Sequence, residues 1–151
     1  MKLRLAAPAD LETLLPLVSA YHRFEGIRHT ADSTRAALRP LLEDPALGRV
    51  WLIEDHGSVA GYLALCFGYS IEFGGRDAFV DELYLLESRR GRGLGKAALE
   101  AAAREAATLG VVALHLEVGT ENAKARKLYE SVGFLPREGF ALLSRPTALK
   151  E

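Results

Sequence analysis

The feature that most constrains the fold is the basic, glycine-rich run Arg89-Arg90-Gly91-Arg92-Gly93-Leu94-Gly95-Lys96. It follows an apolar, strand-like segment over residues 79–86 and precedes an alanine-rich, helix-like segment over 97–109. Glycines let the backbone turn sharply and bring consecutive N–H groups close to a ligand. A helix N-terminus adds unpaired donors and partial positive charge. The run therefore predicts a strand–turn–helix unit that binds a pyrophosphate group.

Two common nucleotide motifs fit this run poorly. A Walker loop requires Gly, four residues and then Gly-Lys-Ser/Thr, whereas position 90 is Arg and Lys96 is followed by Ala97. A dinucleotide fingerprint requires Gly-x-Gly-x-x-Gly, whereas the glycines here give Gly-x-Gly-x-Gly, late in the chain. Neither motif therefore accounts for the run, and the expected pyrophosphate indicates a nucleotide-like cofactor.

The spacing Arg90-x-x-Gly93-x-Gly95 resembles the acyl-CoA pyrophosphate loop of the GNAT superfamily of N-acyltransferases. A second stretch, Asn122-x-x-Ala125-x-x-Leu128-Tyr129-x-x-x-Gly133-Phe134, resembles the helix and following turn of the same superfamily. The start, over residues 3–11, resembles its first strand and the entry to its first helix. The resemblance spans nearly the whole chain, with the elements in the right order.

This resemblance implies acetyl-CoA as the co-substrate and a direct transfer of its acetyl group. The strand before the glycine loop separates from its neighbour in the family, so its backbone pairs with the pantetheine arm, and the thioester carbonyl meets an N–H near Leu85. Asn122 matches a pantetheine-contacting position, with a helix N-cap as an equal alternative. The implied cofactor-binding residues are Leu83, Tyr84, Leu85, Arg90, Gly91, Arg92, Gly93, Leu94, Gly95, Lys96 and Asn122.

The resemblance also supplies candidates for the acid–base chemistry. Tyr129 matches the position that protonates the CoA thiolate, and its alternative is an ordinary half-buried aromatic residue. Asp81 and Glu82 are neighbours in a strand, so they are expected to face opposite sides of the sheet. Asp81 shares parity with Leu83 and Leu85 and is favoured as the base. Glu82 stays a candidate because a bulge would reverse the assignment, and either carboxylate could instead be structural.

Three further groups bear on the acceptor site and on metals. Glu72, near the expected hairpin at Gly74-Gly75, is a third candidate base or a shaper of the acceptor site. In the family, the segment that covers the acceptor site corresponds to the one carrying Tyr21, His22, Glu25 and His29, which could equally be a solvated loop. No metal site is expected, because the histidines, Cys66 and the carboxylates lack ligand spacing.

Composition limits the class of protein. The chain has 151 residues and reads as a single domain over 1–151, and 49% hydrophobic residues suffice for a core. A net charge of −1 gives no global attraction to nucleic acid or to an anionic membrane. Cys66 is the single cysteine, so no intrachain disulfide forms. Without a signal-like or membrane-length apolar run, a cytoplasmic location is expected.

The pattern of apolar residues and turn residues predicts strands over 3–6, 50–55, 59–73, 76–86, 111–118 and 140–144. Helices are expected from Pro8 or Asp10, from an Asp32 or Ser33 cap, after the glycine loop, and from Asn122, with residues 21–30 as a loop or broken helix. The resemblance implies an α/β fold. It has a mixed, mostly antiparallel central sheet of about six to seven strands, about four flanking helices, and splayed central strands that hold CoA.

The expected function is acetyl transfer from acetyl-CoA to a primary amine, with a small cationic amine favoured by the acidic candidates. The alternatives are an inactive acyl-CoA-binding sensor or interaction module, and a protein N-terminal or lysine acetyltransferase. A homodimer is also expected, because the family often dimerises and residues 140–143 could supply an apolar strand.

Overall fold

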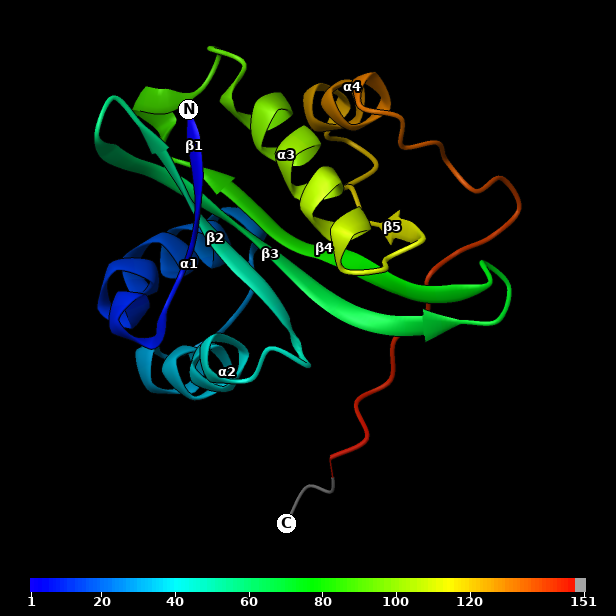
Figure 1. The fold of residues 1–151 in the computed structure, drawn as a ribbon, viewed down its shortest axis with the longest axis horizontal. Helices are drawn as coiled ribbons and strands as arrows, with labels where there is room; N and C mark the ends of the chain where they lie inside the picture. Colours follow the sequence, from blue (N-terminus) through cyan, green and yellow to red (C-terminus); the bar gives the residue numbers. More distant parts are fainter. Residues whose placement is uncertain (149–151) are drawn as a thin grey trace.

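The computed structural model describes residues 1–148. One sheet lies between two layers of helices, one layer on each face (Figure 1). The strands are β1 (Lys2–Leu5), β2 (Gly48–Asp55), β3 (Ser58–Ser70), β4 (Gly75–Leu85) and β5 (Ala113–His115). The helices are α1 (Leu11–Glu25), α2 (Ala31–Glu43), α3 (Leu94–Thr108) and α4 (Ala123–Ser131), and two short 3₁₀ turns, η1 (Pro8–Asp10) and η2 (Glu87–Arg89), join them to strands. The expected mixed α/β architecture is confirmed.

The sheet has the order β1-β2-β3-β4-β5, and only the last pair is parallel. β4 pairs with β5 over just three positions, from Asp77 opposite Ala113 to Phe79 opposite His115. β4 then continues to Leu85 without this partner. β4 and the segment that follows β5 therefore diverge, as the resemblance implies, and leave a wedge beside the second half of β4.

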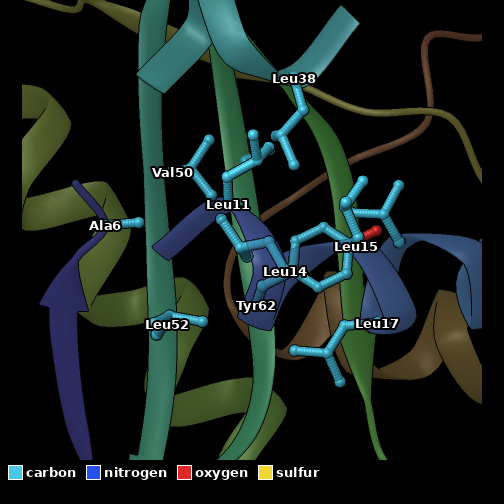
Figure 2. Close-up of a cluster of buried hydrophobic side chains, with 11 residues drawn as sticks. Ala6, Leu11, Leu14, Leu15, Leu17, Leu38, Val50, Leu52 and Tyr62 are labelled. Atoms are coloured by element: carbon cyan, nitrogen blue, oxygen red, sulfur yellow. The ribbon is translucent and has the colours of Figure 1, made fainter. Parts of the chain in front are cut away.

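Two apolar clusters fill the space on the two faces of the sheet. On one face the buried side of α1 and Leu38 of α2 pack against β2 and β3, and Figure 2 shows the leucines of α1 gathered around Val50, Leu52 and Tyr62. On the other face α3 and α4 pack against the sheet, and Trp51, Ile53, Leu63 and Leu65 are buried there. The sheet is thus apolar on both sides and lies buried between the two helical layers.

Small residues bring α3 close to its neighbours. Gly95, Ala98, Ala102 and Ala106 form its buried stripe. A Cβ at Gly95 would lie 3.3 Å from Cδ2 of Leu128 in α4. The N-terminus of α3 is thereby held against α4 at the open end of the wedge.

A β-bulge interrupts β4 at Asp81. Val80 lies opposite Leu65 and Glu82 lies opposite Ala64, so Asp81 has no partner of its own in β3. Beyond the bulge Leu83 and Leu85 pack in the cluster beneath α3, whereas Tyr84 packs in the cluster beneath α1. The bulge therefore interrupts the regular alternation of β4 at Asp81, because it adds one residue between the two halves of the strand.

Several predicted boundaries are also wrong. The strand expected over 111–118 is only Ala113–His115. Residues 140–144 form no strand in the described part of the chain, and the side chains of Phe140 and Leu143 are 72% and 90% exposed. The sheet accordingly has five strands, fewer than the six to seven expected. A strand needs a neighbour to satisfy its backbone groups, and apolar composition alone does not provide one.

The helical boundaries differ at two places. Residues 21–30 are expected as a loop or broken helix; α1 continues to Glu25 and ends at Gly26, whose φ of 70° is left-handed, and α2 begins at Ala31. The N-cap of α2 is Thr30, and Ser33 returns a hydrogen bond to it as in a capping box.

Two further observations concern the chain as a whole. Among residues 1–148, no helix has both the length and the apolar character needed to cross a bilayer. The single domain predicted over 1–151 includes residues 149–151, which lie outside the described residues.

Candidate active site

A cleft of about 800 Å³ occupies the wedge between β4 and the segment that follows β5. The residues predicted from the sequence that line it are Asp81, Leu83, Tyr84, Leu85, Arg90, Gly91, Gly93, Leu94, Gly95, Lys96, Asn122 and Tyr129. Its other walls come from the end of α1, from residues 116–119 and from α4. One cavity thus joins the glycine loop to most of the predicted acid–base groups.

The glycine loop forms the basic end of this cleft. Gly91 and Gly93 have φ values of 76° and 79°, a left-handed conformation that explains glycine at both positions. α3 starts directly after Gly93, and no side chain within residues 1–148 caps its first turn. Its free N–H groups and Lys96 therefore offer donors and charge to an anion at the cleft.

The arginines of the run have different surroundings. Arg90 lines the cleft, donates from Nε to the Leu85 carbonyl at 2.9 Å, and stacks near the rings of Phe24 and Tyr84. Arg92 is predicted as a cofactor-binding residue, but its side chain does not line the cleft; its guanidinium lies 3.6 Å from the Asp55 carboxylate. Arg90 and Lys96 are therefore the residues of the run whose positive charges reach the cleft.

The free edge of β4 points into the wedge. Leu86 donates its N–H to the Ala60 carbonyl on β3 at 2.8 Å. Successive peptide groups along a strand alternate in direction, so the N–H and C=O of Leu85 point away from β3. The carbonyl accepts Arg90, and the N–H is directed toward the cleft.

Asn122 caps α4 and also lines the cleft. Its Oδ1 accepts the N–H of Ala125 at 3.1 Å, which is the capping geometry expected at this position. Its side chain nevertheless belongs to the cleft wall. The two alternatives raised by the sequence are therefore compatible, because only one face of the amide is used by the cap.

Tyr129 projects from α4 into the cleft wall. Its ring packs edge-on against Phe134, with centroids 6.1 Å apart. Burial, and to a lesser degree the nearby charge of Glu25, raises the pKa of the Tyr129 phenol above its usual range. The phenol thus keeps its proton at neutral pH and is available as a donor.

Asp81 and Glu82 have different environments. Asp81 lines the cleft, where burial raises the pKa of its carboxyl while the neighbouring His22 acts in the opposite direction. Glu82 does not line the cleft. Its Oε2 lies 2.6 Å from His22 Nε2, and its Oε1 accepts the Tyr62 hydroxyl at 2.8 Å. Asp81 is the carboxylate open to a ligand, whereas both oxygens of Glu82 are engaged.

Other candidates from the sequence lie elsewhere. Glu72 pairs with Arg137 outside the cleft. His29 stacks on His22, with ring centroids 5.2 Å apart, and does not line the cleft. Tyr21 and Glu25 do line it. Within residues 1–148, no group of three or more His, Cys, Asp or Glu side chains is arranged to hold a metal ion.

The Acetyltransferase (GNAT) family model matches residues 12–134 of the sequence. The chain belongs to this family. The match runs from the first turn of α1 to the residue after Gly133, so it includes every predicted site residue.

Individual relatives agree with this assignment. The chain is 28% identical over 140 residues to YhfO, an uncharacterized N-acetyltransferase of Bacillus subtilis (strain 168), and the match covers 93% of each chain. The structure superimposes with a TM-score of 0.84 and 34% identity on an integron cassette protein from the mobile metagenome of Cole Harbour Salt Marsh, covering 98% of this chain and 91% of that one. A predicted acetyltransferase from Clostridium acetobutylicum, solved with acetyl-CoA, shares the fold at a TM-score of 0.78 and 19% identity, covering 95% of each chain.

Some residues of this GNAT cleft were not identified from the sequence. Phe24, Ile27 and residues 116–119 line it. Outside its lining, Tyr62 donates a hydrogen bond to Glu82, and Asp55 forms an ion pair with Arg92. Tyr62 reads as an ordinary strand residue, and its contact with Glu82 spans 20 positions of the chain. No local pattern marks such residues, because their roles depend on which strands become neighbours.

Proposed function

We propose that this GNAT protein is an N-acetyltransferase that transfers an acetyl group directly from acetyl-CoA to a primary amine. The observation that carries the proposal is the single cleft that contains a basic helix N-terminus, a free strand edge, an open carboxylate and a protonated phenol. These are the groups that a direct transfer needs for binding, polarisation and proton movement.

The binding of acetyl-CoA is supported by the glycine loop and by β4. The N–H groups at the start of α3, together with Arg90 and Lys96, would hold the diphosphate. The free edge of β4 at 83–85 would pair with the amide groups of the pantetheine arm, as in strand addition. A predicted acetyltransferase of the same fold, from Clostridium acetobutylicum, was solved with acetyl-CoA, which supports this choice of ligand.

Three groups would then perform the chemistry. The Leu85 N–H would donate to the thioester oxygen and stabilise negative charge as it develops there. Asp81 would accept a proton from the acceptor ammonium, so that a neutral amine attacks the carbonyl carbon. Tyr129 would give its phenolic proton to the departing thiolate.

The surroundings of the acceptor end favour a cationic amine. Tyr21, Phe24 and Glu25 at the end of α1 form this wall together with Asp81. The pKa of the Tyr21 phenol is raised first by burial and then by the negative charges of Glu25, Glu82 and Asp81. Aromatic faces and a local excess of negative charge both attract an ammonium group.

The test is thiol release from acetyl-CoA with a panel of amines: polyamines, aminoglycosides, amino acids, and peptides with a free N-terminus or lysine. We expect saturable release with at least one small cationic amine, and a product mass increased by one acetyl group. Burial raises the pKa of the Cys66 thiol to about 11, so the protein itself adds little thiolate signal at neutral pH.

Different results of the panel would select different functions. Acetylation of peptides alone would favour protein acetylation over a small-molecule acceptor. Tight CoA binding without turnover on any amine would contradict the proposed enzyme and favour the inactive sensor.

A further inference from the structure

The acceptor end of the cleft is built from two elements that are distant in the sequence. The end of α1 supplies Tyr21, Phe24 and Glu25, here termed the α1 wall, and β4 supplies Asp81. A direct transfer requires the acceptor amine to lie within hydrogen-bond reach of the base and close to the thioester carbon. The separation between the α1 wall and Asp81 therefore decides whether an acceptor is held productively.

Strand pairing does not by itself fix the position of Asp81. The ladder between β4 and β3 skips Asp81, between Val80 and Glu82, and the ladder between β4 and β5 ends at Phe79. Among residues 1–148, Asp81 thus has no ladder partner in either neighbouring strand. Bulges often re-aim a side chain next to an active site. The direction of this carboxyl therefore depends on how its neighbours in the chain are held.

Glu82 is the neighbour that connects the bulge to other elements. Its Oε2 lies 2.6 Å from Nε2 of His22 on α1, and its Oε1 accepts the hydroxyl of Tyr62 on β3 at 2.8 Å. An ionised carboxylate can only accept hydrogen bonds, so both partners donate to it. Charge-assisted hydrogen bonds of this kind are shorter and stronger than neutral ones. One carboxylate thus ties three elements together at the residue next to Asp81.

This contact is buried and lies beside both parts of the acceptor site. The side chains of His22 and Glu82 are 13% and 16% exposed, and Tyr62 is in the core. Burial, and then the charge of Glu82, raises the pKa of the Tyr62 phenol, so the hydroxyl remains a donor. His22 directly follows Tyr21, and Glu82 directly follows Asp81. Each end of the contact is therefore one residue away from a side chain that lines the cleft.

We infer that Glu82 is a positioning residue of the acceptor site: its carboxylate holds the end of α1 against the bulge and so sets the distance between the α1 wall and Asp81. The inference rests on the proposed function, in which Asp81 is the base and the α1 wall binds the acceptor. It assigns Glu82 this role in place of the base, because both of its oxygens are engaged and it does not line the cleft. Glu82 acts through Asp81 and does not touch the acceptor.

The first experiment measures amide hydrogen exchange in Glu82→Ala and Glu82→Gln, and it needs no acceptor. Alanine removes both hydrogen bonds, whereas glutamine has the same shape and can accept from His22 while its amide donates to the Tyr62 hydroxyl oxygen. In Glu82→Ala we expect roughly tenfold faster exchange at the end of α1 and around the bulge, with α3 unchanged. Glu82→Gln should exchange nearly as the wild type does. Wild-type exchange throughout Glu82→Ala would overturn the inference.

The second experiment measures steady-state kinetics with an amine that the wild-type protein acetylates. In Glu82→Ala the acceptor KM should rise and kcat should fall, so that kcat/KM for the acceptor drops roughly 10²-fold. CoA affinity, measured by calorimetry, should stay unchanged, because the glycine loop takes no part in the contact. Glu82→Gln should recover most of the loss.

The two substitutions separate a positioning residue from a base. A loss in Glu82→Gln as large as that in Asp81→Asn would identify Glu82 as a base and overturn the positioning role. Wild-type kinetics in Glu82→Ala, with an active wild type, would overturn the inference and leave the proposed function intact. A wild-type protein that acetylates no amine would overturn the proposed function itself, and the role of Glu82 with it.

Asp77→Ala provides a matched control, because it breaks a similar pair on the same strand. Nε2 of His115 lies 3.1 Å from Oδ2 of Asp77, the two side chains are 19% and 14% exposed, and neither lines this cleft. The control should keep kcat/KM for the acceptor within about threefold. A loss equal to that in Glu82→Ala would mean that breaking any such pair in β4 causes the defect, and would overturn the inference.

Discussion

Asp55 and Arg92 form an ion pair between the end of β2 and the glycine loop, with the carboxylate oxygen 3.6 Å from the guanidinium. Arg89 approaches the same carboxylate at 3.6 Å, and its guanidinium also bonds to Ser58. Because Asp55 is nearly buried, it is a fixed anchor for the two arginines at the back of the loop. Arg89 and Arg92 thus pair with Asp55, whereas Arg90 and Lys96 line the cleft.

We predict that Asp55→Asn loosens the glycine loop. The free energy of unfolding should fall by about 1 kcal/mol, as expected for a partly exposed ion pair, and CoA affinity should fall severalfold. Chemical denaturation and calorimetry measure the two effects. Tighter CoA binding in the variant would instead mean that Asp55 competes with the diphosphate for the arginines.

We predict that Gly93→Asp weakens CoA binding at least tenfold, or about 1.4 kcal/mol. The residue has a φ of 79°, which Asp and Asn tolerate better than other side chains, and a Cβ there meets no atom within 4 Å. The main change is a negative charge at the start of α3. Gly93→Asn has nearly the same shape without the charge and should keep most of the affinity; equal losses would assign the effect to the backbone.

We predict that Asp81→Asn removes the acid limb of the rate–pH profile along with most of kcat. Asp81 must be ionised to accept a proton, and its raised pKa places this limb at higher pH than for an ordinary carboxyl. The same carboxylate has the opposite effect on folding stability, because its ionised form is needed for activity but destabilises the folded state. A raised carboxyl pKa favours the folded state while the group is protonated, and this contribution is lost as the pH rises through that pKa. The variant should therefore unfold no more easily than the wild type at neutral pH.

We predict that Tyr129→Phe lowers kcat by roughly 10²-fold while CoA affinity stays nearly unchanged. The change keeps the ring that packs against Phe134 and removes only the proton donor. Steady-state kinetics and calorimetry separate the two effects. If CoA affinity falls more than turnover, Tyr129 positions the cofactor; if kcat is unaffected, the thiolate takes its proton from water or from the acceptor.

Self-association remains a prediction, and the strand expected to supply the contact is not formed. Phe140, Leu142 and Leu143 are instead largely exposed side chains. Light scattering at micromolar concentration checks whether the protein is a dimer. A monomer would remove the expectation drawn from residues 140–143.

The parts of the site that could be predicted are those that one local segment determines. The turn at Gly91 and Gly93, the cap at Asn122 and the position of Tyr129 each depend on residues within a few positions, so motif spacing sufficed. The fold class followed from the resemblance to the GNAT superfamily, whose elements the chain carries in the same order.

The parts that could not be predicted depend on contacts between distant segments. The role of Glu82 is set by the bulge at Asp81 and by His22, 60 positions away. The pairing of Arg92 with Asp55 requires the β2–β3 turn to reach the glycine loop. Periodicity specifies which face of an element is apolar, but it does not specify which polar groups the finished fold brings together.

Arg90 has a practical consequence for redesign. Its guanidinium contacts the Leu85 carbonyl and lies 5.6 and 5.4 Å from the rings of Phe24 and Tyr84. One side chain of the glycine loop thus contacts both the edge strand β4 and the end of α1. Grafting the α1–α2 connection of a relative would therefore disturb the glycine loop as well. Positions 24, 84 and 90 therefore form one unit that must be exchanged together.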